Sequence, residues 1–86
     1  MQFERTERFK EAYRALSPPD RERVKKALGL LTSNWRHPSL RVKKMQGTRT
    51  IWEARVSRSL RLTFNLEDDV ILLRNVGPHD ETLSNP

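Results

Sequence analysis

The chain has 86 residues, and its 17 lysines and arginines against 11 acidic residues give a formal net charge of +6. We expect a single domain over residues 1–86 with a modest core, because a chain of this length leaves little room for a second domain. The absence of cysteine excludes disulfides and thiolate metal sites. No apolar run approaches the roughly 18 residues that cross a membrane, and no stretch resembles a secretory signal, so we expect a cytoplasmic protein without a structural metal.

The positive charge is distributed unevenly along the chain. Residues 1–64 carry 16 lysines and arginines against 6 acids, whereas residues 65–86 carry 1 against 5. The densest basic block contains one acid, Glu53, and eight cations: Arg36, Arg41, Lys43, Lys44, Arg49, Arg55, Arg58 and Arg61. Such a block attracts phosphate and makes binding depend on salt, which favours a nucleic acid as partner. An acidic protein could bind the same surface.

The first third of the chain predicts a strand followed by two helices. Residues from Met1 to Arg5 form the strand, and Thr6 caps a helix over Glu7–Leu16 whose apolar residues share one face. Ser17 then caps a second helix, with proline at its first position, that runs to about Thr32. Two amphipathic helices joined this closely predict an antiparallel helical hairpin.

From Leu40 onward the apolar period changes from 3.6 to 2, which is typical of half-buried strands. The alternation predicts strands over residues 40–43, 52–56 and 60–66. The run over residues 70–73 is apolar on both faces, which predicts a more central strand, and Asp68-Asp69 before it is a turn signal. The tail from Pro78 shows no strong pattern. These elements predict an α+β fold, with the helical hairpin packed on an antiparallel sheet of about four to five strands.

The strand register follows from keeping apolar residues on one face. A three-residue turn over residues 57–59 pairs Arg55 with Arg61 and Glu53 with Thr63, so that polar residues oppose polar residues. The same turn pairs Val56 with Leu60. A turn at residues 68–69 then places Val76 opposite Arg61 and brings His79 near the 57–59 turn. We therefore expect Glu53, Arg55, Arg61 and His79 to converge at one end of the polar face of the sheet.

Three short motifs resemble those of the RelE/ParE toxin superfamily. The segments Trp52-Glu53-Ala54-Arg55-Val56 and Leu60-Arg61-Leu62-Thr63-Phe64 resemble its paired strands, with the pattern R-V-x-x-x-Y-R-L-x-Y. The segment Asn75-Val76-Gly77-Pro78-His79-Asp80 resembles its closing strand and V-G-x-H/R corner, and residues 37–47 resemble the segment that leads into the strands. The match covers nearly the whole chain in element order, and each motif is short and degenerate.

The resemblance implies a toxin of a toxin-antitoxin system that cleaves messenger RNA, usually on the ribosome, and is held inactive by an acidic antitoxin. Arg61 matches the arginine that binds the scissile phosphate, and His79 matches the His or Arg used for proton transfer or near the leaving group. Glu53 and Arg55 match positions of charged site residues. In place of the aromatic residue that many RNA-cutting members carry after this corner, the chain has only Leu83. ParE-like members, which share the fold, inhibit DNA gyrase without an RNase site.

The residue types themselves suit metal-free RNA cleavage. The substrate 2′-hydroxyl is the nucleophile, so the protein must supply a base, an acid and guanidinium groups for the charged phosphorane. His79 can serve as acid or base, Glu53 as a base, and Arg61 and Arg55 can bind phosphate oxygens in pairs. The remaining cations of the block are candidate RNA-binding residues: Arg41, Lys43, Lys44, Arg49 and Arg58.

Each assignment has a structural alternative. Glu53 could form only a cross-strand ion pair, the arginines only a solvated face, and His79 only a strand-end contact. Among the aromatic residues, Trp52 is expected to pack in the core, and Trp35 either to pack at its edge or to stack on a base. The two histidines lack metal-ligand spacing and no phosphate-binding glycine loop is present, so we expect neither a metal nor a small-molecule cofactor. A third possibility is a degenerate family member that only binds nucleic acid or protein.

Overall fold

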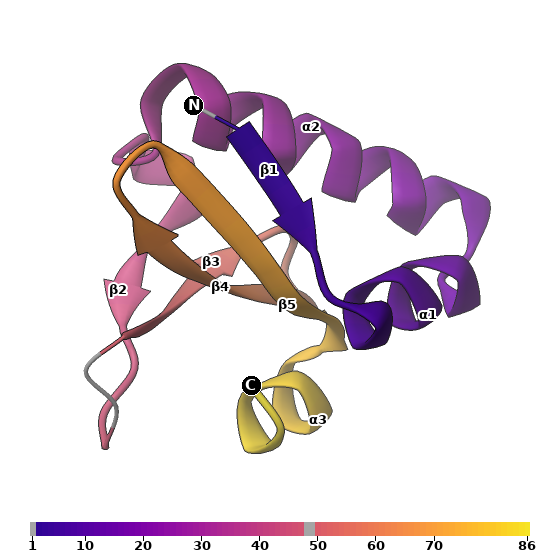
Figure 1. The fold of residues 1–86 in the computed structure, drawn as a ribbon. Coiled ribbons are helices and arrows are strands. Elements are labelled where there is room, and N and C mark those ends of the chain that lie inside the picture. The colour runs from indigo at the N-terminus through magenta and orange to yellow at the C-terminus, as the bar shows by residue number, and fades with distance from the viewer. Residues whose placement is uncertain (1, 48–49) are drawn as a thin grey trace.

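The computed structural model describes residues 2–47 and 50–86, and it confirms the α+β prediction. Figure 1 shows a twisted sheet with helices α1 and α2 on one side and a short helix α3 on the other. Met1, with which the predicted first strand begins, lies outside the described residues. The elements are β1 (Gln2–Arg5), α1 (Glu7–Ala15), α2 (Pro18–Asn34), a 3-10 helix (Pro38–Leu40), β2 (Lys43–Lys44), β3 (Ile51–Arg55), β4 (Leu60–Glu67), β5 (Val70–Pro78) and α3 (His79–Ser84).

The two long helices begin where their caps were predicted. The Thr6 hydroxyl accepts a hydrogen bond from the Phe9 amide at 3.1 Å, and the Ser17 hydroxyl accepts one from the Asp20 amide at 3.3 Å. Each cap satisfies an amide that has no partner within its own helix. The connection between the helices is short, since α1 ends at Ala15 and α2 begins at Pro18. Both helices lie on the same face of the sheet (Figure 1).

The strands lie in the order β1-β5-β4-β3-β2. The pairs β2–β3, β3–β4 and β4–β5 are antiparallel, but β1 pairs with β5 in the parallel direction, so the sheet is mixed rather than wholly antiparallel. A strand pairs in parallel with another only when a long connection carries the chain back to the same end. Here the helices and three strands separate β1 from β5, and no hairpin fixes the direction of β1.

The register of β3 against β4 is the predicted one. Arg55 pairs with Arg61, Glu53 pairs with Thr63, and the Val56 amide donates to the Leu60 carbonyl at 3.0 Å. The polar and apolar sets therefore occupy opposite faces of this pair, as the alternation requires.

The predicted pairing of Val76 with Arg61 is wrong because β5 contains a bulge. Thr63 pairs with Asn75 but Phe64 pairs with Leu73, so Arg74 is an extra residue in β5. Beyond the bulge the register moves by one residue, and Arg61 faces Gly77. Val76 thereby returns to the core face, where it is 3% exposed.

The predicted strand over residues 40–43 is also wrong. Residues Pro38–Leu40 form a 3-10 turn, in which the His37 ring nitrogen Nδ1 accepts from the Ser39 amide at 3.2 Å. Arg41 follows in the left-handed conformation at φ 45°, and strand pairing begins only at Lys43. The local turn buries Leu40 without a strand, which explains why an alternating pattern misled here.

The core lies between the sheet and the two long helices. One helix contributes Phe9 and the other contributes Val24, Ala27 and Leu31. The strands and the 3-10 turn complete the cluster with Leu40, Ala54, Leu62, Phe64, Ile71, Leu73 and Val76.

The tail, for which the sequence shows no pattern, forms α3 on the outer face of the sheet, the face away from α2 (Figure 1). The Thr63 hydroxyl, on this face, donates to the Pro86 carbonyl at 3.1 Å, and Arg74 Nε donates to the same oxygen at 3.0 Å. Gly77, at φ 155°, allows α3 to approach, because a Cβ there would lie 3.1 Å from the Thr82 hydroxyl oxygen. Tertiary contacts therefore hold this six-residue helix in place.

Candidate nucleic-acid interface

Three of the four predicted catalytic residues lie together on the outer face of β3 and β4. Arg55 and Arg61 are directly paired across the two strands, and Glu53 is two residues from Arg55 on the same face. The Glu53 side chain is only 12% exposed, and it forms an ion pair with Lys43 of β2, in which Oε1 lies 3.9 Å from Nζ. Among the described residues, neither arginine forms an ion pair within 4 Å, so the pair keeps its capacity for an anion.

The Arg61 guanidinium is held by the backbone of the turn before it. Its Nη1 donates to the Ser57 carbonyl at 2.8 Å, to the Leu60 carbonyl at 3.0 Å and, more weakly, to the Arg58 carbonyl at 3.4 Å. All the hydrogen bonds that the Arg61 side chain makes to the described residues use this one nitrogen, which leaves Nε and Nη2 for a ligand. A planar guanidinium fixed in this way can offer two parallel N–H groups to phosphate oxygens.

The charges around Arg61 are mostly positive. Burial lowers the pKa of Arg61 below its ordinary value, the positive charge of Arg55 lowers it further, Glu53 opposes the shift, and Arg41 adds to it. Arginine nevertheless remains protonated in proteins. Three mutually repelling cations around one carboxylate are therefore retained, and a bound anion would relieve the repulsion.

Arg41 reaches this cluster through an unusual backbone conformation. It follows the 3-10 turn at φ 45° and ψ 45°, with its amide donating to the Pro38 carbonyl at 3.2 Å. For a residue with a Cβ, the left-handed region costs roughly 1–2 kcal/mol. The sequence predicted Arg41 only as a peripheral RNA-binding residue, because no glycine or asparagine marks this turn.

His79 lies at the same end of the sheet as Arg61 but is a separate group. Its amide donates to the Ser59 carbonyl at 2.9 Å, which confirms the predicted place of His79 near the 57–59 turn. The Arg61 guanidinium is bound to the same turn. Its side chain is 50% exposed, and Nδ1 lies 2.9 Å from a carboxylate oxygen of Asp80. Because a carboxylate only accepts, this contact places the proton on Nδ1 and leaves Nε2 for proton transfer. No side-chain hydrogen bond joins His79 to Arg61 within the described part of the chain.

The other predicted RNA-binding residues surround the cluster unevenly. Lys43 pairs with Glu53, whereas Lys44 pairs with Trp52 and its Nζ lies 5.1 Å from the Trp52 ring centroid. Arg58 is exposed in the turn that holds Arg61. Arg49 lies outside the described residues.

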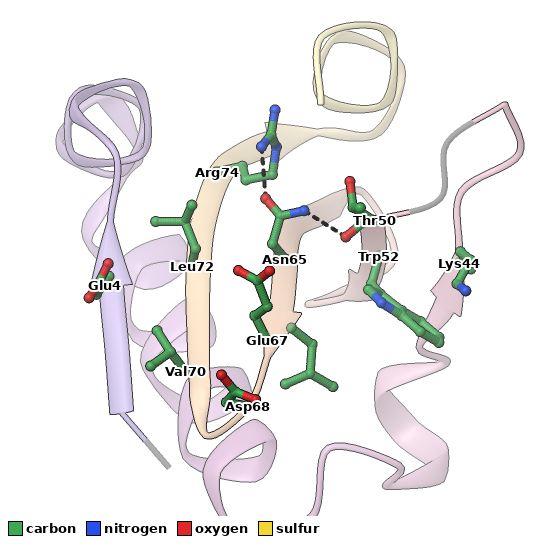
Figure 2. Close-up of a pocket in the computed structure, with 11 residues that line it drawn as sticks. Glu4, Lys44, Thr50, Trp52, Asn65, Glu67, Asp68, Val70, Leu72 and Arg74 are labelled. Atoms are coloured by element: carbon green, nitrogen blue, oxygen red, sulfur yellow. Dashed lines mark hydrogen bonds between the residues drawn. The ribbon is translucent and has the colours of Figure 1, made fainter.

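A cavity of about 770 Å³, separate from the Arg61 cluster, lies along β1, β5 and β4, and Figure 2 shows its lining. Arg74 Nη1 donates to the Asn65 side-chain oxygen at 2.8 Å, and the Asn65 amide nitrogen donates to the Thr50 carbonyl at 2.6 Å. Three acids, Glu4, Glu67 and Asp68, line the cavity against Lys44 and Arg74. Its acidic share makes it a poor site for phosphate, so we place the candidate interface at Arg61.

Among residues 2–47 and 50–86, no three His, Asp or Glu side chains gather closely enough to hold a metal ion. In the same residues, no helix has the length and apolar composition that a membrane span requires.

The fold is similar to that of known protein structures, although the sequence is not. No protein-family model matches the sequence, and no curated protein sequence matches it significantly. Solved structures, however, are similar over almost the whole chain. YafQ from E. coli superposes with a TM-score of 0.79 at 18% identity, over 92% of this chain and 93% of that one.

Two toxin-antitoxin complexes show the same likeness. A chain of the RelB-RelE complex from Methanococcus jannaschii gives a TM-score of 0.76 at 19% identity, with 96% of this chain and 99% of that chain covered. A chain of the E. coli RelBE complex gives 0.73 at 23% identity, with 91% and 95% covered. At these identities the likeness concerns the fold, and the chain therefore has the fold shared by the RelE and YafQ toxins.

Proposed function

We propose that the chain is the toxin of a toxin-antitoxin system and cleaves messenger RNA on the ribosome without a metal ion. The observation that carries this proposal is the Arg61 guanidinium, which backbone carbonyls hold, on a strand position paired with Arg55 and on the same face as Glu53. The RelE-like fold and the family motifs support the same function. We propose that the chain acts in the cytoplasm, where messenger RNA and ribosomes are found.

The proposed reaction needs two proton transfers and one stabilised anion. The substrate 2′-oxygen attacks phosphorus as its proton passes to a base, the bond from phosphorus to the 5′-oxygen breaks, and an acid protonates that oxygen. The products are a 2′,3′-cyclic phosphate and a 5′-hydroxyl end. Arg61 and Arg55 would bind the nonbridging oxygens as negative charge develops, where donors contribute most.

The proton-transfer roles are assigned to Glu53 and His79. Glu53 is a partly buried carboxylate beside the two arginines, which suits a base at the 2′-hydroxyl. His79 would act as the acid in its doubly protonated form, with Nδ1–H held by Asp80 and the Nε2 proton passing to the leaving 5′-oxygen. The substrate would lie between Glu53 and His79. Each proton-transfer role typically raises the rate of cleavage by roughly 10²–10⁴-fold.

A cognate antitoxin is the proposed partner. Two of the similar structures are complexes of a RelE toxin with a RelB antitoxin. The basic block of this chain suits an acidic segment of such a protein. Purification from the native host at moderate salt is expected to recover a small acidic protein with the chain. Recovery of the chain alone, with no neighbouring gene that relieves its toxicity, would contradict this part of the proposal.

Induced expression with mapping of cellular RNA ends tests the proposed activity. We expect translation to stop and messages to be cut to fragments with 5′-hydroxyl ends, and expression of Arg61→Ala to leave them intact. Intact messages together with a DNA-damage response would indicate a ParE-like gyrase inhibitor instead. Intact messages without either response would indicate a chain that only binds.

A further inference from the structure

A cavity of about 380 Å³ opens between the end of α2 and the start of β3. Its lining includes the indoles of Trp35 and Trp52, the side chains of Arg36 and Arg41, and His37, and no acidic residue. We call it the indole pocket. Its volume is within the roughly 300–1,000 Å³ of pockets that bind small ligands, which is ample for one nucleobase.

The two indoles form a partly exposed platform between cations. The rings meet edge to face, with centroids 5.6 Å apart and planes at 75°. The Arg36 guanidinium carbon lies 4.7 Å from the centroid of Trp35, and Lys44 Nζ lies 5.1 Å from that of Trp52, as Figure 2 shows for the second pair. Neither ring is fully buried. Burial of a core edge accounts for the ring contact but not for two cations held against the ring faces.

This combination is the chemistry that binds unpaired bases. Bases stack on aromatic rings and on guanidinium planes, and the neighbouring cations attract the phosphates on either side. Edge-to-face rings with an arginine on one of them offer both kinds of surface within one cavity.

Arg41 connects the indole pocket to the candidate catalytic cluster. It lines the pocket, and its charge also acts on Arg61. The positive charge of Arg41 therefore favours bound phosphate both at the indole pocket and near Arg61. Arg41 is exposed, and its backbone is left-handed, with φ 45°.

We propose that the indole pocket binds one unpaired base of the RNA substrate. The proposal rests on the proposed function for the identity of the ligand. It also answers a gap in the sequence, because after His79 the chain carries only Leu83 where an aromatic residue would stack on a base. Trp35 and Trp52 supply that contact from another part of the fold.

Tryptophan fluorescence tests the proposal directly, because Trp35 and Trp52 are the only tryptophans in the chain. The probe is a decamer of 2′-O-methyl adenosine, which has no free 2′-hydroxyl and stays intact. We expect saturable quenching of the emission. An abasic decamer with the same number of phosphates is expected to bind at least about tenfold more weakly, which corresponds to about 1.4 kcal/mol, and to cause little quenching.

Single substitutions locate the binding. Arg36→Gln and Arg41→Gln remove one charge each from the lining and are expected to weaken binding of the decamer by roughly tenfold. Arg14→Gln removes one charge from an exposed position on α1, at the other end of α2, and is expected to change binding much less. A further variant, Trp35→Leu, removes one platform while Trp52 still reports, and circular dichroism checks that it is folded.

Several results would overturn the proposal. Equal binding of the abasic decamer would mean that only phosphates are recognised, and equal quenching by polyglutamate would indicate an acidic protein at this surface. Equal effects of Arg14→Gln and the two lining variants would mean that no local site exists. Cleavage of unmodified RNA is measured in parallel. Base-dependent quenching without cleavage supports the pocket and contradicts the proposed function, whereas cleavage without quenching refutes the pocket alone.

Discussion

Replacing Arg61 with alanine removes a guanidinium that is held by backbone carbonyls and that forms no ion pair with the described residues. The hydrogen bonds from Nη1 to the Ser57 and Leu60 carbonyls are lost, at 2.8 Å and 3.0 Å. Hydrogen bonds that involve a charged group contribute roughly 1.5–3 kcal/mol each. The loss is offset because a half-buried charge and its repulsion with Arg55 and Arg41 disappear together, and because water can reach the carbonyls of an exposed turn. We therefore expect the free energy of unfolding to change by only about 1 kcal/mol.

The effect on catalysis should be much larger. Removal of one preorganised donor from a developing oxyanion costs about 2.7–4 kcal/mol, or roughly 10²–10³-fold in turnover. Arg61→Lys keeps the charge but loses the paired N–H groups, so it should recover only part of this loss. The informative comparison is between the loss of turnover and the change in the free energy of unfolding for the same variant. A variant that is folded but inactive assigns the residue to the chemistry.

The assay is cleavage of messenger RNA on ribosomes and of free RNA by purified variants under single-turnover conditions. Arg14→Ala, an exposed arginine on α1, is the matched control and is expected to cut at the parent rate. Urea unfolding of each variant gives the free energy of unfolding. Parent-rate cleavage by folded Arg61→Ala would refute the assignment of the site, and the basic face would then be only a docking surface.

Three further predictions concern other parts of the structure. Asp80→Asn should lower turnover on the ribosome by roughly 10-fold or more with little change in binding, because a neutral amide can either accept from or donate to Nδ1 and so no longer fixes the tautomer of His79; unchanged turnover would remove Asp80 from the site. Gly77→Ala should destabilise the fold by about 1–3 kcal/mol in urea unfolding, because φ 155° and a contact of 3.1 Å with Thr82 both oppose a Cβ; an unchanged midpoint would contradict the close packing of α3. Phe64→Ala should cost about 3–5 kcal/mol, since the ring is 0% exposed, and a thermal melt without a shift would contradict its place in the core.

The elements with strong local signals could be predicted from the sequence. Thr6 and Ser17 cap the helices because their hydroxyls satisfy amides that the helix itself leaves unpaired. The β3–β4 register followed from alternation, since a shift of one residue would have buried Arg61. With that register came the pairing of Arg55 with Arg61, which is the centre of the candidate site.

The features that were missed depend on contacts between distant segments. The bulge at Arg74 did leave a signal, because the apolar positions Ile71 and Leu73 are odd-numbered and the next core residue, Val76, is even-numbered. This change of parity requires one extra residue in the strand. Arg41 left no such signal, since its left-handed conformation is set by the 3-10 turn and by packing of Leu40. The functional roles of Glu53 and the other site residues remain predictions.

The brevity of β2 has a consequence for how the chain behaves at high concentration. The outer edge of the sheet on this side is only two residues long, and both residues are lysines, Lys43 and Lys44. A strand from a second copy would gain few backbone hydrogen bonds there. If that strand were the second copy's β2, the lysines of the two chains would also repel one another. The same lysines that border the candidate nucleic-acid interface therefore also protect the sheet from edge-to-edge aggregation. Their replacement by threonine or valine would lower the solubility of the protein and favour aggregation through β2.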